Sequence, residues 1–282
     1  MKKTYDELTF TDDFMFCKIL QNNEDLCKKL LELLLDIDIG DIVKVDKQVP
    51  IEITPDGRGV RFDVYAKDDT GKIYNIEMQN AASDDIRRRS RYYQSVIDVD
   101  HAEKGGRYAD LPDSYIIFIC MFDPFGYGLP KYSFTNRCHE VCNEAIHERR
   151  EESRLKNGYR AEPLELDDGS HKIFINAEAK YDILQKSKLQ PFLEYLKNHQ
   201  PTDSFTDSIE QRVDAAKSKR EWRSDYMTLQ EHYEIERAEG RAEGRADVIR
   251  NMITKLNISI VQACDIAGIS VEEYEALCNI EK

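Results

Sequence analysis

The sequence predicts an α/β fold in which a mixed β-sheet is flanked by helices. Leucines repeat at helical spacing near the start of the chain, polar and apolar residues alternate over 60–66 and 72–79, and residues 115–122 are all apolar. Helical periodicity followed by two alternating segments indicates a helix next to a β-hairpin. An all-apolar segment is typical of a central strand that is covered on both faces. Helices and strands in this order predict a layered sheet.

The length and charge of the chain limit its class. Its 282 residues suggest one large domain or one domain with an appendage. The 54 acidic and 40 basic side chains leave a formal charge of −14, which argues against nonspecific coating of nucleic acid. A local basic patch could still hold phosphates, so an enzyme that acts on nucleic acid is not excluded. The charged fraction of 33% indicates that part of the chain forms solvated helix.

Apolar runs and cysteines predict the location of the protein. The longest apolar run, residues 115–122, is far shorter than the roughly 20 residues that cross a bilayer. The first residues, Met1–Glu7, lack the apolar stretch of a signal peptide. Seven cysteines without a framework spacing fit reduced, mostly buried thiols. We therefore expect a cytoplasmic protein with no membrane association.

The first elements along the chain are expected to be helices. Asp12 and Asp13 precede the apolar residues that begin the first helical segment. A second helix is expected where four leucines share one face, and residues 36–40 end it. The leucines of this face are Leu26, Leu30, Leu33 and Leu34.

Strands are expected next. Residues 43–49 alternate valine with polar residues before Pro50. Residues 60–66 and 72–79 alternate in the same way, and the loop 68–71 between them has a composition typical of a hairpin turn. These segments predict neighbouring strands.

A helix is expected after the hairpin. Ser83 suits its N-cap, and Asp84 and Asp85 suit its first turn because carboxylates there interact favourably with the helix dipole. The helical pattern continues through Val96. The remaining strands of the sheet are expected at residues 115–122, 131–136 and 172–176.

The composition changes after Pro201. Residues 205–255 contain no proline, and an Arg-Ala-Glu-Gly repeat with a period of four spans residues 237–245. Because a helix has 3.6 residues per turn, this repeat drifts around the helix axis, and its glycines weaken the helix. It indicates a solvated linker helix or a weak pairing segment. We therefore divide the chain into a domain of residues 1–200 and a helical extension of residues 201–282.

The extension is expected to end in short helices. Residues 247–256 are amphipathic, and Asn257 and Ser259 can end one helix and begin the next. Gly268 ends that helix, and residues 270–273 have the capping-box pattern of a last one. Little basic charge in this tail disfavours a DNA-reading motif. We expect the C-terminal helices to drive homodimerisation.

Possible metal ligands stand on the two hairpin strands. Asp63 lies on the first strand, Glu77 and Gln79 lie on the second, and strand alternation directs all three to one face. Oxygen ligands suit Mg²⁺, which proteins hold by one or two carboxylates together with water and substrate phosphate. Alternatively, the two acids face solvent or pair with Arg61 and Lys72.

Four arginines crowd the helix that follows the hairpin. Their guanidinium groups suit phosphate oxygens because they donate two parallel hydrogen bonds. On a helix, Arg87 aligns with Arg91, and Arg88 aligns with Tyr92. Alternatively, these arginines form a solvated helix face that pairs with nearby acids. The four residues are Arg87, Arg88, Arg89 and Arg91.

Six segments together resemble a known family. They are Asp13-Phe-Met-Phe16, Arg61-Phe-Asp63-Val-Tyr65, Ile76-Glu77-Met-Gln79, Arg91-Tyr92-Tyr93-Gln-Ser95, Tyr108-x-x-Leu111-Pro112 and Ile116-Ile117-Phe118. As a set they are similar to the Rpn family of recombination-promoting nucleases, also described as PD-(D/E)XK nuclease family transposases. The resemblance covers about residues 5–200, and the Glu-Gly-Arg repeats and helical tail resemble the ends of family members.

The resemblance implies a restriction-endonuclease-like fold that cuts DNA with Mg²⁺, for which Mn²⁺ can substitute. By position, Asp63 and Glu77 match the two catalytic, metal-binding acids, and Gln79 stands where the wider superfamily usually has lysine. Because glutamine carries no positive charge, water activation would depend mainly on the metal. Asp13 is expected to join the metal site through a water molecule or to cap the first helix, and Glu7 is a weaker candidate for the same role.

The resemblance and the residue pattern together predict a Mg²⁺-dependent DNA endonuclease with low sequence preference. Arg87, Arg88 and Arg91 are expected to hold the DNA backbone, and a transposase or recombination activity is implied by the family alone. The alternative is a catalytically inactive DNA-binding or protein-assembly module on the same fold.

A second possible metal site, for zinc, is only weakly supported by the sequence. Cys138, His139, Cys142 and His147 have zinc-like spacing, but no second matching pair follows them. Structural zinc sites usually have four ordered ligands. We therefore expect these residues to belong to a charged loop without a metal.

Overall fold

The computed structural model of the chain contains two compact units, Met1–Ser218 and Lys219–Lys282. The first holds the sheet, and the second is helical. Among the described residues, no helix has both the length and the apolar character needed to cross a membrane. His139, Cys142 and His147 lie outside the described part of the chain. The structure describes residues 3–47, 50–51, 60–102, 105–138 and 164–279.

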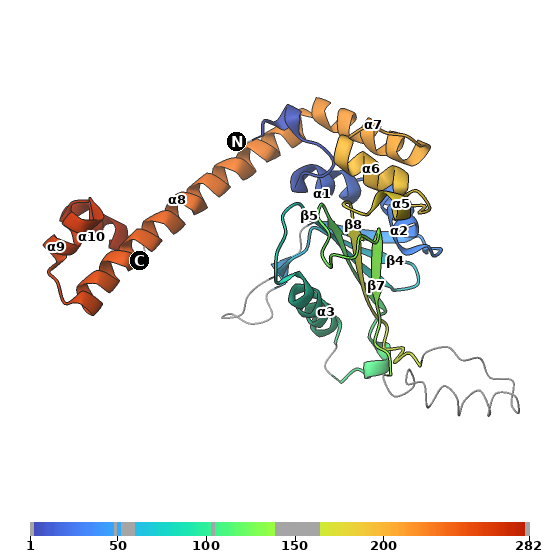
Figure 1. Cartoon of the computed structure of the whole chain (residues 1–282), viewed down its shortest axis with the longest axis horizontal. Helices are drawn as coiled ribbons and strands as arrows, with labels where there is room; N and C mark the ends of the chain where they lie inside the picture. The colour runs from blue at the N-terminus through green and yellow to red at the C-terminus, as the bar shows by residue number, and fades with distance from the viewer. Residues whose placement is uncertain (1–2, 48–49, 52–59, 103–104, 139–163, 280–282) are drawn as a thin grey trace, which may run out of the picture. The chain divides into compact units, whose positions relative to one another are not determined.

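A mixed sheet of six strands forms the centre of the first unit (Figure 1). Its strands are β1 (Ile42–Lys47), β4 (Val64–Asp68), β5 (Ile73–Gln79), β6 (Ser114–Cys120), β7 (Lys131–Phe134) and β8 (Ser170–Asn176). Their order across the sheet is β1-β4-β5-β6-β8-β7. β5, β6 and β8 run parallel, and the other neighbours pair antiparallel. This sheet confirms the predicted fold class.

Helices flank the sheet. Helix α3 (Ile86–His101) packs against β6, whereas the helices near the chain ends of the unit gather on the side away from α3 (Figure 1). The latter group pairs α1 with α2 and α7, and α6 with α7. Its members are α1 (Asp13–Gln21), α2 (Glu24–Leu35), α5 (Tyr181–Leu184), α6 (Gln190–Asn198) and α7 (Ser204–Ser218).

Strand β6 is the covered central strand that its sequence predicts. All seven of its residues are buried. Ile116, Phe118 and Cys120 join the apolar cluster that includes the buried side chains of α3. Because side chains alternate along a strand, Ile117 and Ile119 face the helices on the opposite side. Both faces of the sheet are therefore covered at β6. This explains why its sequence is apolar without interruption.

The strand expected over 60–66 is interrupted. Strand β3 (Val60–Arg61) ends before Phe62 and pairs with β2 (Pro50–Ile51) in a separate two-stranded sheet. The chain bends at Asp63 before β4 begins. Phe62, next to this bend, is fully buried in the apolar cluster under α3. An uninterrupted strand was therefore a wrong prediction, although the hairpin itself is confirmed.

The hairpin turn between β4 and β5 is closed by one buried carboxylate. Asp68 Oδ1 accepts hydrogen bonds from the backbone N–H groups of Thr70 and Lys72, at 3.0 and 2.9 Å. Beyond this turn the strands pair so that Val64 lies opposite Ile76. The turn therefore sets the strand register, and this register places Asp63 and Glu77 next to each other beyond the Val64–Ile76 pair.

Helix α3 begins later than its sequence predicts. Its N-cap is Asp85, and Ile86 is its first residue. The Ser83 hydroxyl donates a hydrogen bond to the Asp85 carboxylate instead of capping the helix. The prediction of Ser83 as the N-cap was therefore wrong by two residues.

Helix α7 packs with the first unit, although the composition changes before it. Arg212 of α7 forms an ion pair with Asp25 at 3.0 Å, and the Tyr5 hydroxyl donates to the Ala216 carbonyl at 2.7 Å. The compact unit therefore extends beyond Pro201. The functional division into residues 1–200 and 201–282 stays a prediction.

The second unit confirms the predicted helix ends. Asn257 and Gly268 adopt the left-handed conformation that ends a helix, and Ser259 and Ser270 begin the helices that follow. Buried side chains from all three helices form one apolar cluster around Ile249. The helices are α8 (Arg220–Leu256), α9 (Ile260–Ala267) and α10 (Val271–Asn279).

Candidate active site

Asp63 and Glu77 lie opposite each other where the β4–β5 hairpin opens. The backbone N–H of Asp63 donates to Glu77 Oε1 at 3.2 Å. The backbone N–H of Met78 donates to Asp63 Oδ2 at 3.1 Å. Each carboxylate therefore accepts a hydrogen bond from the main chain of the segment that carries the other. This reciprocal pairing brings the two predicted acids together.

Both acids are held in an environment that disfavours their charge. Glu77 is 2% exposed, and burial followed by the charge of Asp63 raises its pKa well above the ordinary value. Burial also raises the pKa of Asp63 to about 6, and the charge of Asp13 adds to this effect. Two neighbouring carboxyls with raised pKa values, one buried and one half-buried, are typical of functional sites. The pair has an excess of negative charge that a cation would relieve.

Asp13 stands beside this acidic pair. It is the first residue of α1, and its N-cap is Asp12, so Asp13 does not cap the helix. The Asn80 amide nitrogen lies 3.5 Å from Asp13 Oδ1. At the other end of the helix, the Gln21 amide donates to the Asp63 carbonyl at 3.3 Å. Helix α1 therefore packs along the segment that carries the first acid.

Two of the predicted site residues are engaged elsewhere. Glu7 Oε2 accepts hydrogen bonds from both the backbone N–H and the hydroxyl of Thr4, at 2.7 and 2.8 Å. Arg87 donates to the Pro124 carbonyl at 3.2 Å and lies over the Phe125 ring at 4.8 Å. Glu7 therefore serves the N-terminal turn, and Arg87 holds the loop after β6.

Gln79 is joined to the acids through an arginine that the sequence-based site prediction omitted. Arg89 Nη1 donates to Gln79 Oε1 at 3.0 Å, and Arg89 Nη2 lies 3.8 Å from Glu77 Oε2. The Gln79 amide nitrogen donates to the Met78 carbonyl at 3.0 Å. Both ends of the Gln79 amide therefore have hydrogen-bond partners.

A signal for Arg89 was present in the sequence. Arg89 lies three residues after Ile86 and four before Tyr93, so it shares their face of α3. Ile86 is buried and Tyr93 packs on the apolar cluster beneath the helix. An arginine on that face is directed toward the sheet, whereas its neighbours Arg88 and Arg91 are exposed.

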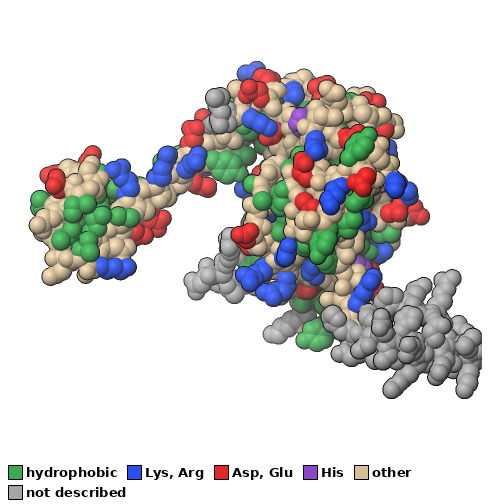
Figure 2. All heavy atoms as spheres, viewed as in Figure 1, with side chains coloured by type: hydrophobic (Ala, Val, Ile, Leu, Met, Phe, Trp, Pro, Cys, Tyr) green, Lys and Arg blue, Asp and Glu red, His purple; other side chains and the backbone are tan. Residues whose placement is uncertain are grey.

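Arg88 and Arg91 line a cavity together with Arg89, the ion-pair partner of Glu77. Its volume is about 810 Å³, and it extends along the first half of α3. Figure 2 shows Lys and Arg side chains gathered where α3 lies in Figure 1. This cavity therefore has a basic wall, and one of its lining residues, Arg89, also contacts Glu77. Its lining consists of Val60, Arg61, Ser83, Asp85, Arg88, Arg89, Arg91, Tyr92 and Tyr93.

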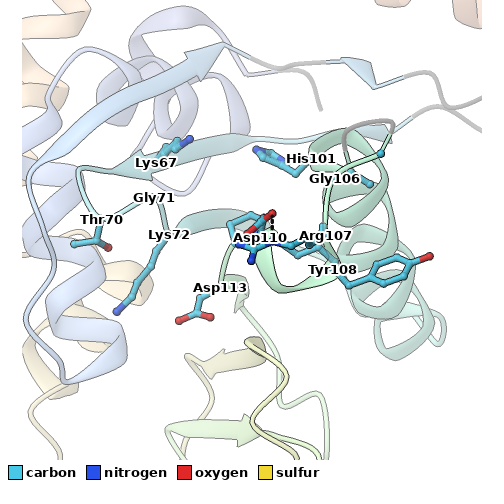
Figure 3. Close-up of a pocket in the computed structure, with 14 residues that line it drawn as sticks. Lys67, Thr70, Gly71, Lys72, His101, Gly106, Arg107, Tyr108, Asp110 and Asp113 are labelled. Carbon is cyan, nitrogen blue, oxygen red and sulfur yellow. Dashed lines mark hydrogen bonds and ion pairs between the residues drawn. The ribbon is translucent and has the colours of Figure 1, made fainter.

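A second cavity, of about 860 Å³, lies at the other end of α3 (Figure 3). Figure 3 shows that Lys67 and Lys72 extend in different directions there. Arg107 is paired with Asp110 at 2.6 Å. The charged side chains of this cavity therefore do not converge on one point, and we assign the candidate active site to the acidic pair.

The donor set at the acidic pair suits a divalent cation. Within the described residues, no group of three or more His, Cys, Asp or Glu side chains could hold a metal ion. Asp63 and Glu77 nevertheless supply hard oxygen donors, and Mg²⁺ needs only one or two carboxylates because it keeps several water ligands. Burial is the largest cause of the raised pKa of each group, and the charge of a neighbouring carboxylate adds to it. The residues present therefore fit such an ion.

The fold and the site together define a class of protein. A mixed sheet flanked by helices, with one acid on β5 and the other directly before β4, next to a basic helix, has the architecture of PD-(D/E)XK nucleases, which generally use divalent metals. The family of PD-(D/E)XK nuclease family transposases matches residues 10–237, so the chain belongs to this family. Its membership supports a function of the nuclease or transposase type and implies a DNA substrate. Comparisons with curated proteins and with solved structures found no match.

Proposed function

We propose that this chain is a Mg²⁺-dependent DNA endonuclease with low sequence preference. The observation that carries the proposal is the carboxylate pair of half-buried Asp63 and buried Glu77, held together by reciprocal backbone hydrogen bonds. Keeping two like charges together in a shielded site is costly. A cation that both groups bind would explain why they are kept together.

The proposed mechanism assigns each acid a defined task. Asp63 and Glu77 would hold the ion, Asp13 would orient a water molecule, and Gln79 would position the attacking water or the ion. Bound Mg²⁺ or Mn²⁺ supplies Lewis acidity, which polarises a phosphodiester and lowers the pKa of water. Because Glu77 is almost fully buried, its carboxylate is shielded from competing bulk water. The raised pKa values mean that cation binding displaces protons from this pair.

The basic face of α3 suits the DNA backbone. The exposed guanidinium groups of Arg88 and Arg91 line the cavity beside the acids, and we assign them to phosphate binding. Arg87 can join them only by leaving its contacts with Pro124 and Phe125. Contacts to phosphates position DNA without reading its bases. We therefore infer low sequence preference.

We also propose that the protein is a homodimer that associates through its C-terminal helices. Hydrophobic side chains gather on one face of the second unit (Figure 2). Val261 and Ile266 of α9 are each 63% exposed, and Leu256 is 64% exposed. Light scattering on the full chain and on residues 1–218 tests this proposal. A dimer that persists without the second unit would contradict it.

A plasmid-nicking assay tests the catalytic proposal. We expect nicking of supercoiled DNA with Mg²⁺ or Mn²⁺, none with EDTA, and at least a roughly 100-fold loss in Asp63→Ala and Glu77→Ala. Asp100→Ala, which removes an exposed acid from α3, is the control and should leave the rate unchanged. Salt-sensitive DNA binding without cleavage would favour the alternative, a catalytically inactive DNA-binding module. Absence of both would favour a protein-assembly role.

A further inference from the structure

Arg89 brings a positive charge into contact with the candidate active site from helix α3. Its guanidinium donates to Gln79 Oε1 at 3.0 Å through Nη1 and lies 3.8 Å from Glu77 Oε2 through Nη2. These two acceptors stand two residues apart on β5, on the face that α3 covers. One planar group therefore connects the second acid with the amide that follows it.

The guanidinium is fixed by an aromatic support. The central carbon of Arg89 lies 5.5 Å from the ring centroids of both Tyr93 and Phe118. Arg89 Nη2 also donates to the Tyr93 hydroxyl at 3.4 Å. The two rings stack on each other at 5.9 Å, and Phe118 stacks on Phe174 at 5.4 Å. Because these rings are packed in the core, they hold the Arg89 guanidinium in place. The side chain therefore loses little conformational entropy when it contacts Glu77.

Arg89 also reaches the arginine-lined cavity. It contributes to the wall of that 810 Å³ space together with Arg61, Arg88 and Arg91. Its side chain is 28% exposed, whereas that of Glu77 is 3% exposed. Arg89 therefore links the buried Glu77 carboxylate with the basic cavity.

We propose that Arg89 is a positioning residue of this active site. It holds the Gln79 amide and the Glu77 carboxylate in one arrangement and offsets part of the negative charge that the two acids share. Gln79 has no charge of its own, so Arg89 supplies the cation at this point of the strand. This inference rests on the proposed endonuclease function and adds a residue to it.

Relocating the charge provides the sharpest test. We expect Arg89→Ala to lower kcat about 100-fold and to change KM for DNA less than about threefold. Arg89→Lys keeps the charge but loses the fork, so it should recover part of the rate. The double variant Gln79→Lys with Arg89→Ala places a cation at the same contact from β5. We expect it to cleave at least about tenfold faster than Arg89→Ala alone.

Arg212→Ala is the matched control. Arg212 is 27% exposed, forms an ion pair with Asp25 at 3.0 Å and donates to Asn23 Oδ1 at 2.8 Å. It therefore resembles Arg89 in burial and bonding but lies away from the acids. Its loss should lower the melting temperature and leave kcat within about twofold.

Two kinetic results would overturn the proposal. The first is cleavage by Arg89→Ala within about threefold of the wild-type rate. The second is failure of both Arg89→Lys and the charge-relocated double variant to recover any rate, which would reduce Arg89 to a packing role.

A measurement without DNA or metal separates this inference from the proposed function. The measurement is the fall in melting temperature that Arg89→Ala causes in EDTA, in two backgrounds: the wild-type chain and the Glu77→Gln variant. We expect the larger fall in the wild-type background, because the Glu77→Gln variant lacks the Glu77 charge that Arg89 offsets. Equal shifts in the two backgrounds would overturn the positioning role. If the wild-type chain does not cleave, the proposed function fails, and this comparison still decides whether Arg89 and Glu77 act together.

Discussion

Replacing Asp63 by asparagine should make the metal-free protein more stable. The substitution removes one of two like charges that lie together in a largely buried site. Asparagine keeps an oxygen that can accept the hydrogen bond from the Met78 N–H, now 3.1 Å from Asp63 Oδ2. The side-chain volume is nearly unchanged. We therefore expect the main effect of Asp63→Asn to be the loss of an unfavourable charge.

The size of this effect follows from the pKa of the carboxyl. Burial, and then the charge of Asp13, raises the pKa of Asp63 from 3.8 to about 6. Each pKa unit corresponds to about 1.4 kcal/mol, so the ionised group costs the fold about 3 kcal/mol. Partial exposure of Asp63 screens this charge, and we expect a gain of about 2 kcal/mol. For a unit of this size that gain raises the melting temperature by roughly 4–8 °C.

The gain depends on pH in a defined direction. Because the folded pKa lies above the unfolded one, the folded state holds the proton more tightly between pH values of about 4 and 6. Asp63 therefore lowers the free energy of unfolding progressively as the pH rises through this window. The full penalty is present at pH 8 and absent below pH 4.

Thermal unfolding followed by circular dichroism in EDTA provides the measurement. Wild-type and Asp63→Asn chains should differ at pH 8 and converge near pH 4. A variant that melts at or below the wild-type temperature at pH 8 would refute the reasoning. An equal gain at both pH values would refute it too, because the gain would then not come from ionisation.

Three further predictions concern the ion, a loop and a helix cap. Ca²⁺ at a hundredfold excess over its Kd should stabilise the wild-type chain by about 2.7 kcal/mol in thermal unfolding but not a chain that lacks both Asp63 and Glu77. Gly128→Ala should cost at least about 1–2 kcal/mol in urea unfolding, because its φ is +74° and a Cβ would lie 2.4 Å from Lys180 Cγ. Ser259→Ala should lower helix stability in the second unit by about 1 kcal/mol, since its side chain accepts from the Gln262 N–H, and hydrogen exchange measures this.

Periodicity and turn chemistry were sufficient to predict most of the fold. The apolar run of β6 and the composition of the 68–71 turn indicated the central strand and the hairpin, because both are local properties. The bend at Asp63 was not predictable in this way. Phe62 fits the alternation of a continuous strand, and its burial under α3 depends on a helix more than twenty residues later.

The candidate site was predictable where the β4–β5 hairpin carries its residues, with Asp63 directly before β4 and Glu77 on β5. Alternation placed Asp63 on the same face as Glu77, and the structure brings them together. Arg89 was harder to recognise because it stands among four arginines of equal charge. Only its position relative to Ile86, toward the buried face of α3, distinguishes it from Arg88. The partners of a charged residue depend on tertiary packing, which local sequence does not encode.

Because of the reciprocal hydrogen bonds at Asp63 and Glu77, the geometry of the two acids depends directly on the alignment of the two hairpin segments. Each carboxylate is anchored to the main chain of the opposing segment, so neither can keep its place if the segments slide. A one-residue slip would send Glu77 to the opposite side of the sheet. An insertion within the tight connection at residues 69–71, six residues from either acid, would therefore dismantle the site while leaving every residue in it unchanged. The length of this connection in a homologous chain therefore indicates whether that chain keeps its two acids aligned.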